Sequence, residues 1–246
     1  MLHLDTGDPT LARFVRDLEA ESPLAAPGEQ LVPDLALGTE ADLEVAQLAW
    51  ANRVVDEYQS VVVFSDLLAI LSAAAAPFAT LCAVQRLIGD ELRHARLCAR
   101  MVAGLGGWEA FDLDLVAERA RPRGEPREHP VARALEVVAL NLWIGEAESL
   151  PVIRAYRDAA SDPASKRALE ILHRDEVRHA ATGRALFDAL DQAFANEPIQ
   201  RVRAGLAGRM EAERRRLGGL YRASAIGGPG RVFGASLLPE DLPTER

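Results

Sequence analysis

GDELRHARL (residues 89 to 97) and RDEVRHAAT (residues 174 to 182) share the pattern D-E-x-R-H-A, and the organisation of the whole chain follows from this repeat. Side chains three residues apart lie on one face of a helix, so each copy directs a carboxylate and an imidazole towards one place. The pairs are Glu91 with His94 and Glu176 with His179. One E-x-x-H pair arises easily by chance, but two matching copies predict that one helical hairpin occurs twice.

Apolar residues surround both motifs on their own helical faces. They are Val84, Leu87 and Ile88 before the first motif, and Leu169, Leu172 and Leu186 around the second. Both motifs are therefore expected to face the core. Burying several acids there without compensation would cost many kcal/mol, and bound cations are the simplest compensation. Each pair is thus predicted to bind metal.

Helix start and stop signals predict four long helices. Thr39 is a cap for a helix to about Ala75, and Pro77 opens a second helix that reaches Leu105. A third helix is expected over residues 131 to 160 and a fourth over residues 164 to 194, joined by the turn Ser161-Asp162-Pro163. The predicted fold class is all-α, a four-helix bundle with additional N- and C-terminal helices.

Three segments follow from this reading. Residues 1–40 are an N-terminal lead-in with a short helix from Pro9 to Glu21, residues 41–195 are the bundle, and residues 196–246 hold a C-terminal helix and an irregular tail. The segment PRGEPREHP, residues 122 to 130, is the clearest linker and separates the two hairpins.

The first helix of each hairpin is expected to supply one more acid. Residues of an antiparallel hairpin lie level when they are equidistant from its turn, and Glu146 and Glu176 are centred on Ser161. Glu57 and Glu91 are centred near Ala74, just before the second helix opens.

Each of these acids has a rival. Asp66 lies at nearly the right height, but Glu57 alone interrupts an apolar stripe that runs from Trp50 to Leu71, so Glu57 is preferred. Glu148 competes with Glu146, which is preferred because Gly145 beside it would permit close helix approach and because Pro151 removes a backbone hydrogen bond at this level.

The ligand set Glu57, DELRH (residues 90 to 94), Glu146 and DEVRH (residues 175 to 179) resembles that of the ferritin-like di-iron carboxylate proteins. In that superfamily two helices each give a Glu and two each give Glu-x-x-His. The D-E-x-R-H form is similar to the oxygen-activating members, such as bacterial multicomponent monooxygenases and ribonucleotide reductase small subunits. The resemblance implies a ferritin-like bundle with two iron ions, or with manganese or a mixed pair.

The resemblance also implies roles for neighbouring residues. Glu91 and Glu176 would bridge the metals, Asp90 would orient His179, and Asp175 would orient His94. Arg93 and Arg178 would pair with nearby acids. His173 is either an added ligand, as in some arylamine N-oxygenases of this superfamily, or a residue that lines the pocket or bonds a neighbour.

Composition excludes several classes of protein. The formal net charge is -9 and Arg is interleaved with Glu and Asp, so no nucleic-acid partner is expected. Cys82 and Cys98 are too few for a disulfide framework or a rubredoxin-type site. The N-terminus does not read as a secretory signal, and Asp66 and Pro77 interrupt the longest apolar stretch, so a cytoplasmic protein without a membrane span is expected.

The predicted function is that of a non-haem di-iron oxidoreductase, which uses dioxygen and an external electron donor to oxidise a small organic substrate. The alternative is a ferritin-like or rubrerythrin-like protein that handles metal or scavenges peroxide without an organic substrate. A homodimer is the default expectation for the oligomeric state.

Overall fold

The computed structural model describes residues 31–107, 130–194, 197–223 and 228–236, and all regular elements in these ranges are helical. They are, in order, η1 (Leu35–Leu37), α2 (Glu40–Ala73), α3 (Phe78–Gly104), α5 (Pro130–Val137), η2 (Val138–Gly145), α6 (Glu146–Ala159), α7 (Pro163–Ala193), α8 (Glu197–Ala223) and η3 (Arg231–Phe233). This confirms the all-α class. The predicted helix from Pro9 to Glu21 and most of the linker lie outside the described residues.

The helices begin where the sequence predicts. Thr39 and Asp42 form a capping box at the start of α2: the Thr39 hydroxyl accepts from the Asp42 amide at 3.2 Å, and the Asp42 carboxylate accepts from the Thr39 amide at 2.9 Å. At the start of α7, Asp162 accepts from the Ser165 amide at 2.7 Å and Pro163 is the first helical residue. Side-chain caps therefore set where α2 and α7 begin.

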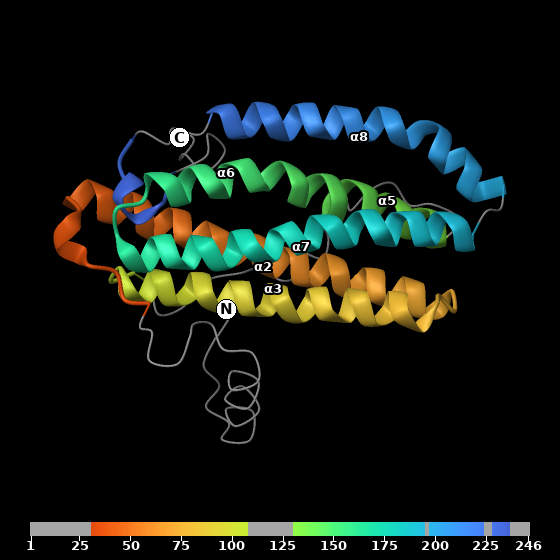
Figure 1. Cartoon of the computed structure of the whole chain (residues 1–246), viewed down its shortest axis with the longest axis horizontal. Helices are drawn as coiled ribbons and strands as arrows, with labels where there is room; N and C mark the ends of the chain where they lie inside the picture. The colour runs from red at the N-terminus through yellow and green to blue at the C-terminus, as the bar shows by residue number, and fades with distance from the viewer. Residues whose placement is uncertain (1–30, 108–129, 195–196, 224–227, 237–246) are drawn as a thin grey trace, which may run out of the picture.

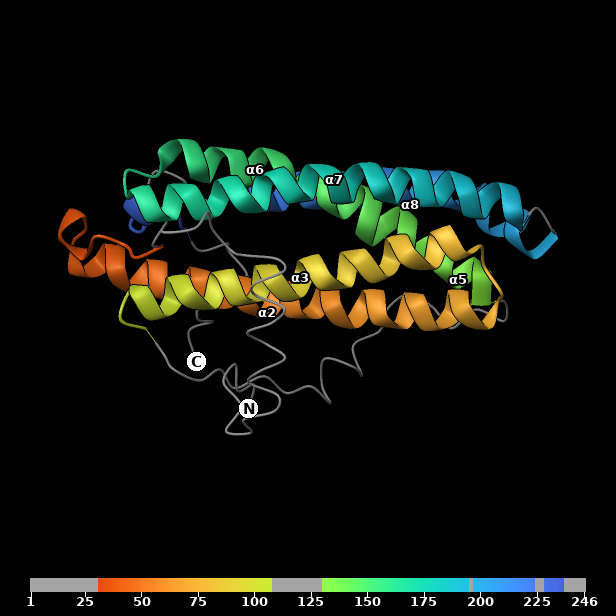
Figure 2. The ribbon, with the colours of Figure 1, turned by 60° about the horizontal axis from the view of Figure 1, so that its bottom comes forward.

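The helices form two layers. Helices α2 and α3 pack as one hairpin and α6 and α7 as the other, and α3 packs against α7 (Figure 1). Figure 2 shows α5 slanting away from the layer of α6, α7 and α8 towards α2, which it contacts. Helix α8 packs along α5, η2 and α6. Within the described ranges, none of the helices has the length and apolar composition that crossing a bilayer requires.

The third long helix contains a π-helical stretch. Residues Val138–Gly145 join α5 to α6 without a break, and α6 then continues through Pro151. A Cβ atom on Gly183 of α7 would lie 2.8 Å from the Trp143 nitrogen, so the two backbones touch there. The close approach expected at Gly145 therefore occurs at Gly183, since a Cβ on Gly145 would meet only the Leu140 carbonyl oxygen of its own turn. Such π segments are frequent near functional sites.

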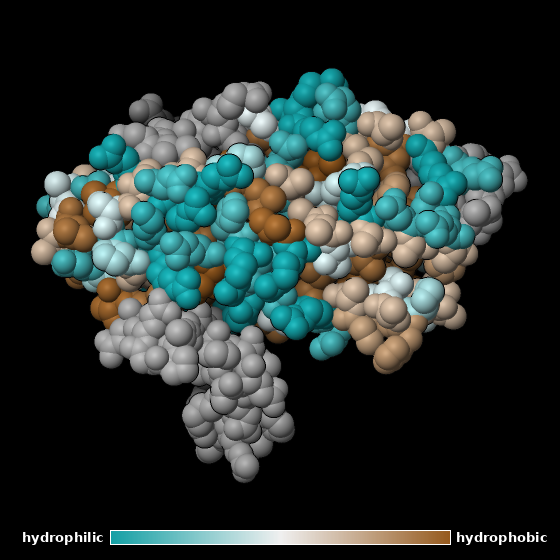
Figure 3. Space-filling model, viewed as in Figure 1, coloured by the Kyte–Doolittle hydropathy of each residue, from teal (hydrophilic) through white to brown (hydrophobic). Residues whose placement is uncertain are grey.

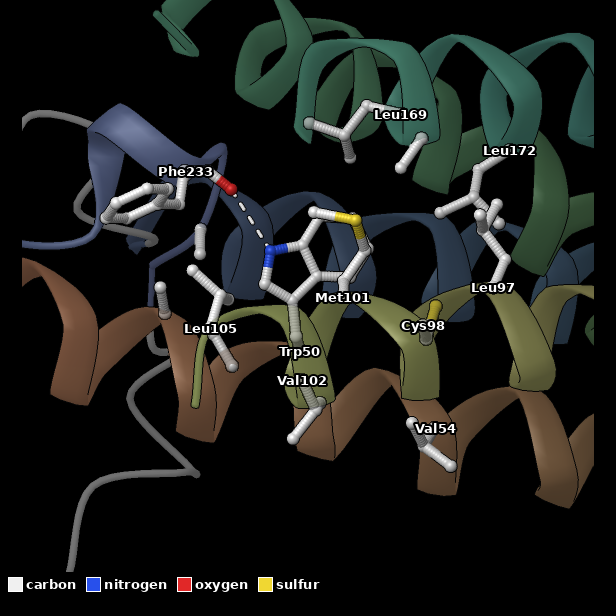
Figure 4. Close-up of a cluster of buried hydrophobic side chains, with 14 of the residues drawn as sticks. Trp50, Val54, Leu97, Cys98, Met101, Val102, Leu105, Leu169, Leu172 and Phe233 are labelled. Atoms are coloured by element: carbon white, nitrogen blue, oxygen red, sulfur yellow. Dashed lines mark hydrogen bonds between the residues drawn. The ribbon is translucent and has the colours of Figure 1, made fainter. Parts of the chain in front are cut away.

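Two apolar clusters occupy the two ends of the bundle. The first cluster, drawn in Figure 4, includes Trp50, Val54, Leu97, Met101, Leu169, Leu172 and Phe233. Its Trp50 indole N–H donates to the Phe233 carbonyl at 3.1 Å and so ties η3 to the bundle. The second cluster includes Phe64, Leu67, Leu71, Val84, Leu87, Leu135, Leu142 and Leu186.

The layer between the two clusters is polar. On α2 the first cluster ends at Val54 and the second begins at Phe64, and on α7 the corresponding limits are Leu172 and Leu186. On α3 the interval lies between Leu87 and Leu97. Both E-x-x-H motifs fall in this interval.

Candidate metal centre

The two E-x-x-H motifs meet in the middle of the bundle. Glu91 and His94 come from α3, Glu176 and His179 come from α7, and all of them are buried. One candidate ligand atom from each of these residues lies within 4.8 Å of all the others.

The δ nitrogens of both imidazoles face the carboxylates. His94 Nδ1 lies 3.5 Å from Glu91 Oε2 and 3.2 Å from Glu176 Oε1. His179 Nδ1 lies 3.1 Å from Glu91 Oε1 and 2.8 Å from Glu176 Oε2. Each carboxylate thus directs one oxygen towards each histidine, which is the arrangement needed to bridge two cations.

The residues present fit bound metal ions. Despite their burial, His94 Nδ1, His179 Nδ1, Glu91 Oε1 and Glu176 Oε2 have no hydrogen-bond partner of acceptable geometry among the described residues. Buried polar atoms are rarely left in this way. Mixed carboxylate and imidazole donors suit iron or manganese better than a thiolate-rich zinc site.

The first helices of the two hairpins bring Glu57 and Glu146 to the same place. Glu57 Oε2 lies 3.4 Å from His94 Nδ1. Glu146 is close enough to Glu176 and Glu91 for their charges to raise its pKa, in addition to a larger effect of burial. The rivals point elsewhere: Asp66 is exposed, and Glu148 accepts from Arg214 of α8 at 3.1 Å.

Two aspartates stand behind the histidines in a crossed arrangement. His94 Nε2 lies 3.3 Å from Asp175 Oδ2, and His179 Nε2 lies 3.5 Å from Asp90 Oδ2. Each aspartate therefore contacts the histidine of the other motif, as the resemblance implies for this pair.

Arginines hold these aspartates. Arg93 donates to Asp90 Oδ1 at 3.2 Å and also to Asp175, so it joins the two motifs. Arg178 lies 2.7 Å from Asp175 Oδ1 and 3.7 Å from Asp90 Oδ2. Burial alone would raise the pKa of Asp175, but hydrogen bonds from His94 and Arg174 and the Arg93 charge hold that pKa well below its usual range.

Two further arginines on the outside of the site were not predicted from the sequence. Arg86 lies 3.3 Å from Asp90 Oδ2, and Arg174 lies 3.1 Å from Asp175 Oδ1. The i, i+4 spacing of Arg86 and Asp90 is the signal that could have indicated the first contact. Figure 3, which looks onto the face formed by α3 and α7, shows hydrophilic residues gathered over the middle of that face.

Burial and mutual contacts shift the pKa values of the side chains at this site. Burial raises the pKa of Glu57 to about 8, and it also raises that of Glu146. Burial would raise the pKa of Glu176 as well, but the His94 and His179 rings lower it overall. Burial would lower the pKa of His179, but contacts with Asp90, Glu176 and Glu91 raise it to about 12. Any metal must therefore displace protons from this site.

A cavity of about 420 Å³ reaches the carboxylate side of the site. Its wall includes the carboxylates of Glu57, Glu91, Glu146 and Glu176, but neither His94 nor His179. Helices α2, α6 and α8 and the π segment supply most of the remaining wall. The carboxylate side of the site is thus open, and the imidazole side is closed by the aspartates and arginines.

His173 belongs neither to the group of ligand atoms nor to the wall of the cavity. Its pKa is lowered by burial and then by the positive charges of Arg157 and Arg154. Both the extra-ligand and the pocket-lining alternatives are therefore unsupported, because its imidazole is near the arginines of α6.

Comparison with family models, curated proteins and solved structures finds no match for this chain. The class of the site therefore rests on its own geometry. A buried cluster from two E-x-x-H motifs in an all-helical fold is compatible with a ferritin-like di-iron site.

Proposed function

We propose that this protein is a non-haem di-iron oxidoreductase that uses dioxygen to oxidise a small organic substrate. The observation that carries the proposal is the asymmetry of the site: four carboxylates line a cavity of about 420 Å³, and both histidines lie outside its wall. A site that only stores or anchors metal has no need of such a cavity. Cavities of this size are typical of small-molecule sites.

The side chains divide into two roles. Glu91, Glu176, His94 and His179 would hold the metals, the histidines through Nδ1, and Glu57 and Glu146 would supply further carboxylate ligands. The iron pair, when bound and reduced, supplies the electrons for dioxygen activation. An external reductant is needed to restore it.

The aspartates fix the tautomer in which the two imidazoles would bind metal. When Asp175 accepts from His94 Nε2, and with Asp90 Oδ2 3.5 Å from His179 Nε2, the Nδ1 atoms of both rings are left to face the site. Glu57 keeps 15% of its side chain exposed, compared with 1% for Glu91, and its pKa is raised to about 8. It is therefore suited to transfer a proton between the cavity and the centre.

The apolar part of the cavity favours an organic substrate over the alternative of peroxide scavenging or metal handling. Val63, Phe64, Leu140, Val152 and Ile153 lie on the wall beside the acids. This apolar surface would add little to the binding free energy of peroxide. It would favour binding of an organic substrate, because the hydrocarbon part of the substrate would be removed from water there.

Metal analysis of full-length protein expressed with added iron tests the proposal. We expect about two iron ions per chain, as in the di-iron carboxylate proteins. We also expect dioxygen consumption that needs a reductant and yields an oxidised organic product by mass spectrometry. Peroxide consumption without any such product would support the alternative, and fewer than about one metal ion per chain would rule out both.

Two variants on α2 provide a matched comparison. Glu57→Ala should lower the iron content, because it removes an acid whose Oε2 is 3.4 Å from His94 Nδ1. Asp66→Ala removes an exposed acid of the same helix and should leave the iron content unchanged. Loss of iron from the Asp66 variant alone would show that the wrong acid has been assigned.

A further inference from the structure

Arg53 is a cation inside the cavity that reaches the candidate metal centre. It lies one helical turn before Glu57 on α2, and both side chains line the cavity wall. Its guanidinium carbon is 4.7 Å from the centre of the Trp50 ring and 4.9 Å from that of the Tyr156 ring. The two rings hold the guanidinium in place by cation–π contact.

The Arg53 guanidinium makes no ion pair within the part of the chain that the structure describes. Its Nη1 atom is buried and makes no hydrogen bond, and no carboxylate of the described residues forms an ion pair with it. Arg216 of α8 lines the same cavity, but it lies 2.7 Å from a Glu213 oxygen. Among these two cations of the wall, Arg53 is the one left to bind an anion.

We propose that Arg53 binds the carboxylate of the substrate, so that the substrates of this protein are small carboxylic acids with an apolar body. This inference rests on the proposed function, because it names the substrate class of the same cavity. A guanidinium matches a planar carboxylate with two parallel N–H donors.

The position of Arg53 keeps the anion away from the metals. Residues four apart on a helix are separated by about 6 Å along its axis, so the substrate carboxylate would lie roughly one turn from the level of Glu57. The apolar body would then extend along Val63, Phe64 and Ile153 and present its C–H bonds to the open carboxylate side of the centre.

Calorimetric titration of the full-length protein with two acid and amide pairs tests this assignment. The probes are octanoate with octanamide, and benzoate with benzamide. We expect each acid to bind at least about tenfold more tightly than its amide, because a charge-assisted pair is lost in the amide. Arg53→Gln should abolish this preference, whereas Arg53→Lys should retain part of it. Arg216→Gln, which changes a paired cation of the same wall, should retain it fully.

Iron content, measured on every sample, separates this inference from the proposed function. An acid preference that survives Arg53→Gln would overturn the inference, because the carboxylate would then bind the metals or another cation. The same holds for the absence of any acid preference in wild-type protein with normal iron content. An Arg53-dependent preference in protein that binds no iron would uphold the carboxylate subsite and overturn the di-iron function.

Discussion

At the scale of single residues, Asp175 connects a candidate metal ligand to several arginines. It lies beside His94 Nε2 and is held by Arg93, Arg174 and Arg178. Its carboxylate is fully buried, so its charge acts on the imidazole without solvent screening. Asp175 is not itself a candidate metal ligand. A substitution of Asp175 therefore tests how the orientation of His94 affects metal binding.

Asp175→Asn should weaken iron binding by about 10–100-fold, the usual effect of removing the hydrogen-bond partner of a metal-bound histidine. The amide keeps the shape of the side chain but removes the charge that orients the His94 ring. Competition with a chelator measures the change in affinity. Asp158→Asn, at an exposed carboxylate paired with Arg157, is the matched control and should bind iron normally. Equal affinities in both variants would contradict the role given to Asp175.

Metal affinity should rise with pH from about 6 to 9 without levelling off near 7, where a free imidazole of pKa about 6.5 is already deprotonated. The reason is that the pKa of His179 in the metal-free protein is raised to about 12 and that of Glu57 to about 8. Protons at these groups compete with the metal throughout this range, and lower pH strengthens the competition. Calorimetry in buffers of different ionisation enthalpy would measure the protons released. A plateau above about pH 7.5 would mean that the histidines are neutral before metal binds.

At the scale of elements, the sequence predicted the two hairpins because their caps are local. Thr39 and Asp162 fix where α2 and α7 begin through contacts within a few residues. Equal distances from the turns then placed Glu57 level with Glu91 and Glu146 level with Glu176. His173 stays a prediction that the structure does not support, and helix geometry gives a reason: each step of three residues falls about 60° short of a full turn. His173 and His179 therefore diverge to opposite sides of Glu176.

The π segment could not be predicted, because nothing in its local sequence VALNLWIG demands it. Its backbone touches α7 at Gly183, and that contact joins residues far apart in the chain. The sequence therefore predicted α5 and α6 as one continuous helix. It did not predict the π segment in the middle of that helix.

Gly183→Ala should destabilise the protein by about 1–3 kcal/mol, the usual range for overpacking a tight core. The added methyl group would lie 2.8 Å from the Trp143 nitrogen and 2.9 Å from the Leu142 carbonyl carbon, both of which are backbone atoms. Urea denaturation measures the free energy of unfolding. Gly208→Ala on α8 is the control, since its methyl group meets nothing within 4 Å. It should stabilise the protein by up to about 1 kcal/mol through helix propensity. Stabilisation by both substitutions would mean that α7 and the π segment do not touch.

At the scale of the whole molecule, the sequence left the place of α8 open. Its arginines alternate with acids, and this pattern does not indicate which helices they contact. In the structure Arg209 pairs with Glu136 of α5, and Arg214 pairs with Glu148 of α6. Both acids are on other helices, so the packing of α8 decides which acids its arginines contact. The same packing decides which residues of α8 form the wall of the cavity.

Iron should raise the thermal stability of the whole protein. The polar layer that holds the candidate ligands lies between two apolar clusters, and neither cluster stabilises this layer. A ligand that binds only the folded state adds about 2.7 kcal/mol at 100 times its dissociation constant. Hydrogen exchange should slow most at the middle of α3 and α7. The Glu91→Gln, Glu176→Gln double variant should gain neither effect. Equal gains in that variant would show that iron binds elsewhere.

The same layer of unpartnered ligand atoms has a consequence in the cell. A chain whose middle is completed only by metal would open more often when metal is scarce, and proteases act on the open form. We therefore expect the lifetime of this protein to follow the iron supply: molecules that have not acquired the metal would be degraded first, and the amount of protein would match the number of working sites.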